Sequence, residues 1–132
     1  MTPARIVALA YAAILFAAAA LNYVPGVTGE DGLAFGIFAL DPFDDALHLA
    51  SGVWALAAGL ISHRASHVFL VAFGALYLAD GLMGLAIGSG YLDLGVLRWG
   101  VQDLPFGFKV LANLPHIGLG GAALAAGLLA RR

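Results

Sequence analysis

Four apolar stretches, each long enough to cross the hydrocarbon core of a bilayer, constrain this chain more than any other feature. They cover residues 5–23, 44–62, 66–88 and 110–130. An α-helix of about 20 apolar residues crosses that core, and it satisfies all of its backbone hydrogen bonds within the segment. The sequence therefore predicts an all-α fold, in which four transmembrane helices form an antiparallel bundle.

The composition supports a membrane protein and excludes several other classes. Of 132 residues, 62% are hydrophobic and only 11% are charged, whereas about a quarter of the residues in soluble domains are charged. We therefore expect a single membrane domain over residues 1–132, with the lipid bilayer around it. A net charge of -2 argues against nucleic-acid binding. The absence of cysteine excludes disulfides, thiolate nucleophiles and iron–sulfur clusters.

The distribution of charge predicts an orientation. Arg5, Arg64, Arg131 and Arg132 lie at the two termini and at the short connection between the second and third stretches. All of the acids except Asp80 lie in or beside the two long connections. The positive-inside rule places the arginine-rich end in the cytoplasm. We therefore expect a multi-pass protein of the bacterial inner (cytoplasmic) membrane with both termini cytoplasmic.

An internal repeat is the most specific pattern in the chain. Residues 45–64 (DALHLASGVWALAAGLISHR) align without a gap with residues 113–132 (NLPHIGLGGAALAAGLLARR). The alignment pairs His48 with His116, Gly52 with Gly120, and Arg64 with Arg132. It predicts two two-helix repeats of the same orientation, about 5–64 and about 66–132, related by an axis along the membrane normal. The first stretch has a weaker counterpart in the third, which opposes its interpretation as a cleaved signal peptide.

Three ionisable residues within the predicted spans are candidates for a functional site. The repeat places His48 and His116 at equal depth near the outer ends of their helices, and Asp80 lies deeper in the third helix. Three interpretations stay open for them. They form hydrogen bonds that specify packing, or the two histidines bind haem b or a transition metal with Asp80 as a partner. In the third interpretation they form a proton or ion path.

Glycines accompany both histidines one turn further along each helix. Gly52 and Gly120 lie on the same helical face as His48 and His116, respectively. Small residues allow helices to pack closely in lipid, and this is the simpler interpretation. The alternative is that each glycine leaves room beside its histidine for a flat cofactor.

Motifs of soluble catalysis are absent from the sequence. It contains no Ser-His-Asp catalytic-triad motif, no Gly-rich phosphate-binding loop and no His/Cys metal motif. We therefore expect a non-enzymatic accessory or interaction subunit of a larger membrane complex, or a homo-oligomer. A haem- or metal-binding protein that uses His48 and His116 is the alternative, and a small ion or solute carrier is a further one. Segments of the two long connections (residues 32–45 and 97–109) mix aromatic and acidic residues, which predicts short interfacial or re-entrant segments or a partner-docking surface.

The repeated element resembles one found in a family of membrane proteins. Asn or Asp, then His three residues later, then Gly four residues after the His, occurs at residues 45–52 and again at residues 113–120. This pattern resembles an uncharacterised family of small bacterial four-helix integral membrane proteins, in which the element recurs in helices two and four. The resemblance covers nearly the whole chain and implies the four-helix fold, but it implies no activity. Pro115 and the long acidic connections depart from the family pattern.

Overall fold

The computed structural model describes residues 1–130, so Arg131 and Arg132 of the predicted cytoplasmic end lie outside the described residues. The elements are α1 (Pro3–Ala20), the 3-10 helix η1 (Leu21–Tyr23), α2 (Pro42–Ile61), α3 (His63–Ile87), α4 (Gly95–Trp99) and α5 (Phe106–Leu129). Within residues 1–130 only isolated β-bridges accompany the helices. The prediction of an all-α fold is confirmed.

Three helical segments are long and apolar enough to cross a membrane: Pro3–Tyr23, His63–Ile87 and Phe106–Leu129. They correspond to the first, third and fourth predicted spans. The second predicted span, α2, is less apolar because Asp44 and Asp45 lie in its first turn. By length and hydropathy alone, three of the four predicted spans therefore qualify as membrane-crossing helices.

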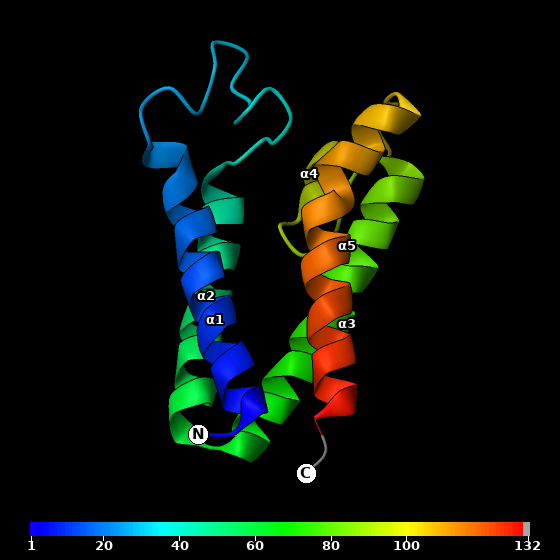
Figure 1. Ribbon diagram of the computed structural model, residues 1–132. Helices are drawn as coiled ribbons and strands as arrows, with labels where there is room; N and C mark the ends of the chain where they lie inside the picture. The colour runs from blue at the N-terminus through cyan, green and yellow to red at the C-terminus, as the bar shows by residue number, and fades with distance from the viewer. Residues whose placement is uncertain (131–132) are drawn as a thin grey trace.

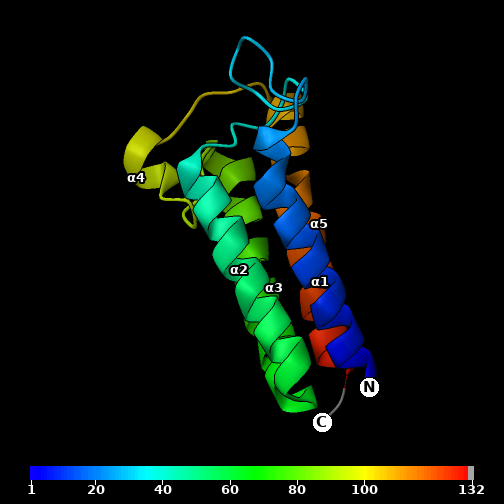
Figure 2. The ribbon, with the colours of Figure 1, turned by 90° about the vertical axis from the view of Figure 1, so that its left-hand side faces the viewer.

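The long helices form two hairpins. α1 packs along α2, and α3 packs along α5 (Figure 1). The hairpins lie close together near the α2–α3 turn and diverge toward the end that carries the long connections (Figure 1). The N-terminus, the α2–α3 turn and the end of α5 share the opposite end, which a second view confirms (Figure 2).

The connection between α2 and α3 is shorter than the predicted turn of residues 63–65. α3 already begins at His63, and the break in helical structure falls on Ser62, whose backbone is extended. The Ser62 hydroxyl accepts a hydrogen bond from the backbone N–H of Ala65 at 3.0 Å. Serine is a favoured N-cap because its side chain satisfies an N–H group that the helix leaves unpaired. One capping residue is therefore enough to reverse the chain.

Close backbone contact holds α3 against α5. A Cβ atom at Gly120 would lie 2.8 Å from the carbonyl carbon of Tyr77, and one at Gly74 would lie 2.7 Å from Cα of Leu124. Because these neighbours are backbone atoms, they cannot rotate away from a side chain. In the first hairpin the equivalent glycines face side chains instead: Gly52 faces the ring of Phe16. The small-residue faces therefore serve helix packing, as the simpler interpretation predicted.

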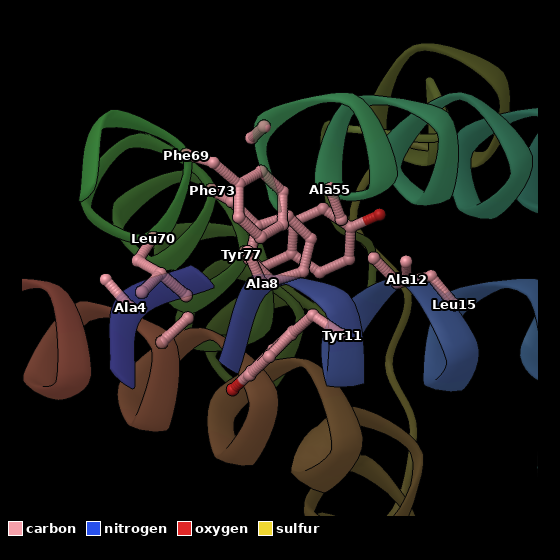
Figure 3. Packing of buried hydrophobic residues seen from close by; sticks show 12 residues of the cluster. Ala4, Ala8, Tyr11, Ala12, Leu15, Ala55, Phe69, Leu70, Phe73 and Tyr77 are labelled. Carbon is pink, nitrogen blue, oxygen red and sulfur yellow. The ribbon is translucent and has the colours of Figure 1, made fainter. Parts of the chain in front are cut away.

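An aromatic stack fills the space between the two hairpins at mid-depth (Figure 3). Phe69, Phe73 and Tyr77 of α3 stack with ring centroids 4.9 and 4.0 Å apart. Tyr11 of α1 meets Phe73 edge to face at 5.5 Å, and its hydroxyl donates a hydrogen bond to the carbonyl oxygen of Leu119 in α5 at 2.6 Å. Such contacts bury large apolar areas and also fix geometry. The stack therefore joins α1, α3 and α5.

Arg5 links the two helices of the first hairpin at the arginine-rich end. Its Nε donates a hydrogen bond to the carbonyl oxygen of Gly59, and its Nη2 donates to that of Leu60, both at 2.8 Å. These carbonyls belong to the last turn of α2, where no further N–H group of the helix reaches them. A cation there also interacts favourably with the helix dipole.

Candidate functional site

The three candidate ionisable residues meet near the outer end of the bundle. Nδ1 of His116 lies 2.5 Å from Oδ2 of Asp80, which accepts its hydrogen bond. The ring of His48 stands edge to face with that of His116, with the centroids 5.9 Å apart and the planes at 87°. His48 and Asp80 are only 7% and 4% exposed. Helices α2, α3 and α5 each supply one member, so the site exists only when both hairpins are in place.

Asp80 also holds the chain that follows α3. Its Oδ1 accepts hydrogen bonds from the backbone N–H groups of Tyr91 and Leu92, at 2.8 and 2.9 Å. Gly90 approaches so closely that a Cβ atom there would lie 2.7 Å from Cγ of Asp80. One carboxylate thus orients His116 with one oxygen and ties the connection to α3 with the other.

A second polar pair lies beneath the histidines, and sequence reasoning missed it. The ring of Tyr77 lies 5.0 Å from that of His116, and the hydroxyl groups of Tyr77 and Ser51 share a hydrogen bond of 2.8 Å. Tyr77 precedes Asp80 by three residues, and Ser51 follows His48 by three residues. Residues three apart share a helical face, so this spacing is the signal that could have found the pair.

His48, Asp80 and His116 form the floor of a cavity of about 390 Å³ between the hairpins. Residues from α2, α3, α5 and both long connections line the cavity. The ionisable residues in its wall are Asp41, Asp44, Asp80, Asp93, His48, His116 and Lys109. Because the long connections surround its mouth, the cavity opens at the end of the molecule that is opposite the termini.

The deepest helix residues that line the cavity are His48, Asp80 and His116, and the aromatic stack lies beyond them without lining it. One and two turns further along α3 from Tyr77, toward the arginine-rich end, lie Phe73, Leu70 and Phe69, each 0% exposed. These side chains offer no hydrogen-bonding group to an ion. The structure therefore contains a polar cavity open at one end, and it gives no support to the predicted proton or ion path through the bundle.

Arg98 in α4 joins the two long connections at the mouth of the cavity. Its Nη1 lies 2.7 Å from Oδ2 of Asp41, the N-cap residue of α2. Its Nη2 donates to the carbonyl oxygen of Asp93 at 3.2 Å, and the guanidinium lies 4.1 Å from the ring centroid of Phe43. The second long connection contains the short helix α4. The first connection contains no helix between η1 and α2.

The Arg98–Asp41 ion pair is expected to weaken in acid. Burial opposes ionisation of Asp41, but hydrogen bonds from Arg98 and from the backbone N–H of Asp44 outweigh it, so the pKa of Asp41 lies below its ordinary value. An unfolded aspartate has a pKa of about 3.9. Because the pKa of Asp41 is lower in the folded state, its ionised form stabilises the fold fully above that value. The stabilisation is lost as the pH falls from there through the pKa of the folded state. Hydrogen exchange of residues 95–99 should therefore be constant from neutral pH to about pH 4, after correction for the intrinsic rate, and accelerate below it. An Asp41→Asn variant that retained this acid transition would contradict the assignment.

The space beside both glycines is occupied in this structure. The ring of Phe16 occupies the space beside Gly52, and the backbone of α3 occupies the space beside Gly120. Tyr77 fills the space on the inner side of His116. A tetrapyrrole held between the two imidazoles would need this volume, so the observed packing does not support haem.

The predicted metal site also has too few ligands. Within residues 1–130, no group of three or more His, Cys, Asp or Glu side chains has an arrangement that could hold a metal ion. Asp80, the predicted partner, uses its oxygens for His116 and for two backbone N–H groups. The pair His48 and His116 alone is a poor metal cage.

Comparisons of this chain with protein-family models, with curated proteins and with solved structures give no match. The resemblance to a four-helix membrane family therefore stays a prediction, and the inference of function depends on the geometry of the cavity.

Proposed function

We propose that this chain is a four-helix protein of the bacterial inner membrane that binds a small ligand from the periplasmic side. The ligand enters the cavity between the hairpins and contacts His48 and the Asp80–His116 pair at its floor. One observation supports this function above all: His48 and the hydrogen-bonded Asp80–His116 pair lie together in the wall of a cavity of about 390 Å³, with the two imidazole rings in contact. Cavities of this size commonly hold small molecules.

The direction of the chain supports α2 as the fourth span. α1 and α3 both begin at the arginine-rich end and are both apolar enough to cross the membrane (Figure 1). α2 leads from the far end of α1 back to the start of α3 and packs against both helices. It must therefore traverse the same thickness of membrane. Its acidic first turn then lies at the outer boundary, where Asp44 lines the cavity rather than facing the hydrocarbon core.

The orientation of the chain follows from its arginines. Arg5 and Arg64 lie at the end with the termini, and the acids other than Asp80 lie at or near the other end. The positive-inside rule then places the cavity mouth in the periplasm. Both termini are cytoplasmic in this arrangement.

The closed floor favours binding over transport. A carrier or channel needs polar contacts on both sides of its binding site, and here the aromatic stack separates the cavity from the cytoplasmic end. The role of accessory subunit, also predicted from the sequence, would place a partner protein over the same mouth. It is therefore an alternative outcome of the experiment below.

Cysteine accessibility tests the proposal without background labelling, because the chain contains no native cysteine. Single variants Gly29→Cys, Ala112→Cys, Arg64→Cys and Ala123→Cys would be treated with a membrane-impermeant maleimide on right-side-out vesicles. We expect labelling at Gly29→Cys in the first long connection and at Ala112→Cys in the cavity wall. Arg64→Cys should react only after permeabilisation, and Ala123→Cys, which replaces a fully buried residue of the same helix as Ala112, should not react.

The alternatives give different results in this experiment. Labelling of Arg64→Cys from outside would reverse the orientation. An unreactive Ala112→Cys together with a stoichiometric partner protein in the mass spectrum of the intact complex would favour the accessory role. A Soret absorption band lost in both His48→Ala and His116→Ala would restore the haem interpretation.

A further inference from the structure

We infer that the cavity binds a primary ammonium group attached to a small apolar body. The inference depends on the proposed function, since it identifies the class of ligand for the same cavity. Three observations support it: the negative charge of the cavity wall, a buried imidazole nitrogen of His48 without a hydrogen-bond partner, and the apolar surface around them.

The wall carries more negative charge than its own cations neutralise. Of its four aspartates, Asp80 is paired with His116, and Asp41 is paired with Arg98. Asp44 is 8% exposed, and its carboxyl group lies beside that of Asp93. Within residues 1–130, Lys109 forms no ion pair with either carboxylate. Arg98 Nη2 lies 3.8 Å from Oδ2 of Asp93, whose Oδ1 accepts a 2.9 Å hydrogen bond from the backbone N–H of Gly95.

Neighbouring carboxylates in a poorly solvated site repel each other, so they favour a shared proton or a bound cation. The backbone N–H of Asp41 donates a 3.4 Å hydrogen bond to Asp44, whose carboxyl group also lies within hydrogen-bond reach of that of Asp93. The Asp44–Asp93 pair is therefore the strongest attraction for a cation on the cavity wall.

His48 supplies a third polar group independently of the acids. Its side chain lines the cavity and is more than nine-tenths buried, yet its Nδ1 has no hydrogen-bond partner. A neutral imidazole has one nitrogen that accepts a hydrogen bond. A primary ammonium carries three N–H donors, which matches two carboxylates and one imidazole. A quaternary ammonium has no such donor.

The rest of the wall is suited to an apolar body. Ile37 and Phe38 contribute from the first long connection, and Phe108 contributes from α5. A bare metal ion would leave this surface and most of the volume without contact. The described residues also provide no group of three metal ligands. An organic cation uses both the acids and the apolar wall.

A primary ammonium can reach this site from two sources. One is a free amine in the periplasm, and the other is the headgroup of an aminophospholipid in the outer leaflet. The recognition chemistry is the same, so the experiment must separate the two sources.

The test is calorimetric titration of the full-length protein in phosphatidylcholine nanodiscs, with empty nanodiscs as the blank. The probes are n-hexylamine, hexyltrimethylammonium and 1-hexanol, which differ only in the polar group. We expect saturable binding of hexylamine alone. Asp44→Asn and Asp93→Asn should each weaken it by about tenfold or more, as expected for the loss of a charge-assisted hydrogen bond. Asp103→Asn, which changes an exposed acid outside the cavity, is the matched control and should have no effect.

Equal binding of hexylamine and hexyltrimethylammonium would overturn the inference, since N–H donors would then be irrelevant. Absence of saturable amine binding would also overturn it. If Ala112→Cys is nevertheless labelled from outside, the cavity stands and only the class of ligand is wrong. If Ala112→Cys is unreactive, the proposed function itself fails. When binding is observed, weaker binding in phosphatidylethanolamine nanodiscs identifies the lipid headgroup as the occupant, and unchanged binding identifies a soluble amine.

Discussion

Replacing Gly120 with alanine should strongly destabilise the second hairpin. The added Cβ atom would lie 2.8 Å from the carbonyl carbon of Tyr77 and 2.9 Å from the carbonyl oxygen of Gly74. Both are backbone atoms of α3, so only separation of the two helices relieves the contact. Overpacking of this kind typically costs about 1–3 kcal/mol, occasionally more. Because His116 is one turn away on α5, we also expect its contact with Asp80 to loosen.

The neighbouring glycine provides a matched control. A Cβ atom at Gly121 would meet no atom within 4 Å. Gly121→Ala should therefore leave stability unchanged or raise it by up to about 1 kcal/mol, because alanine has the higher helix propensity. The measurement is denaturant unfolding in detergent micelles followed by circular dichroism. Equal stabilities for Gly120→Ala and Gly121→Ala would show that α3 and α5 do not pack as described.

Removal of the Asp80 carboxylate should have the second large effect. Asp80→Ala deprives His116 of its hydrogen-bond partner and leaves the N–H groups of Tyr91 and Leu92 without an acceptor. Each buried donor that loses its acceptor typically costs about 1–3 kcal/mol, and the three donors that lose Asp80 are at least partly buried. We therefore expect a strongly destabilised protein, in which the connection after α3 separates from that helix.

Asp80→Asn separates the two roles of this side chain. The amide oxygen can still accept from Tyr91 and Leu92, whereas the amide nitrogen replaces the oxygen that faces His116. Amide hydrogen exchange should therefore remain slow at residues 91 and 92 in Asp80→Asn and become fast in Asp80→Ala. A double-mutant cycle with His116→Gln would measure the coupling between the two side chains. Equal exchange in both variants would contradict the anchoring role.

Much of the helical layout could be predicted, because lipid tolerates only backbone that satisfies its own hydrogen bonds. The predicted spans lie within a few residues of α1, α2, α3 and α5. The repeat alignment predicted equal depth for His48 and His116, and their ring centroids lie 5.9 Å apart. Helix ends were less accurate, since the Ser62 cap and the start of α3 at His63 depend on a single side-chain hydrogen bond.

Other features have no signature in the sequence. No pattern in the sequence pairs Arg98 with a carboxylate, yet it bridges Asp41 and Asp93, which lie in different connections. The apolar character of Phe69 and Phe73 indicated burial, but not that they would lie beyond the floor of a cavity. Gly52 and Gly120 suggested room for a cofactor because their sequence context does not show which atoms lie opposite.

Local chemistry by itself determined which segments are helices, which end carries the basic residues, and which polar groups lie at matching depth. These properties follow from the length of the apolar runs, the positions of the charges and the spacing of the repeat. None of them requires knowledge of tertiary contacts. Only the tertiary structure decided that Asp80 pairs with His116 rather than His48, and that the stack of Phe69, Phe73 and Tyr77 lies beyond the floor of the cavity. Both depend on the angle and separation of the two hairpins, which are set by contacts between residues far apart in the chain.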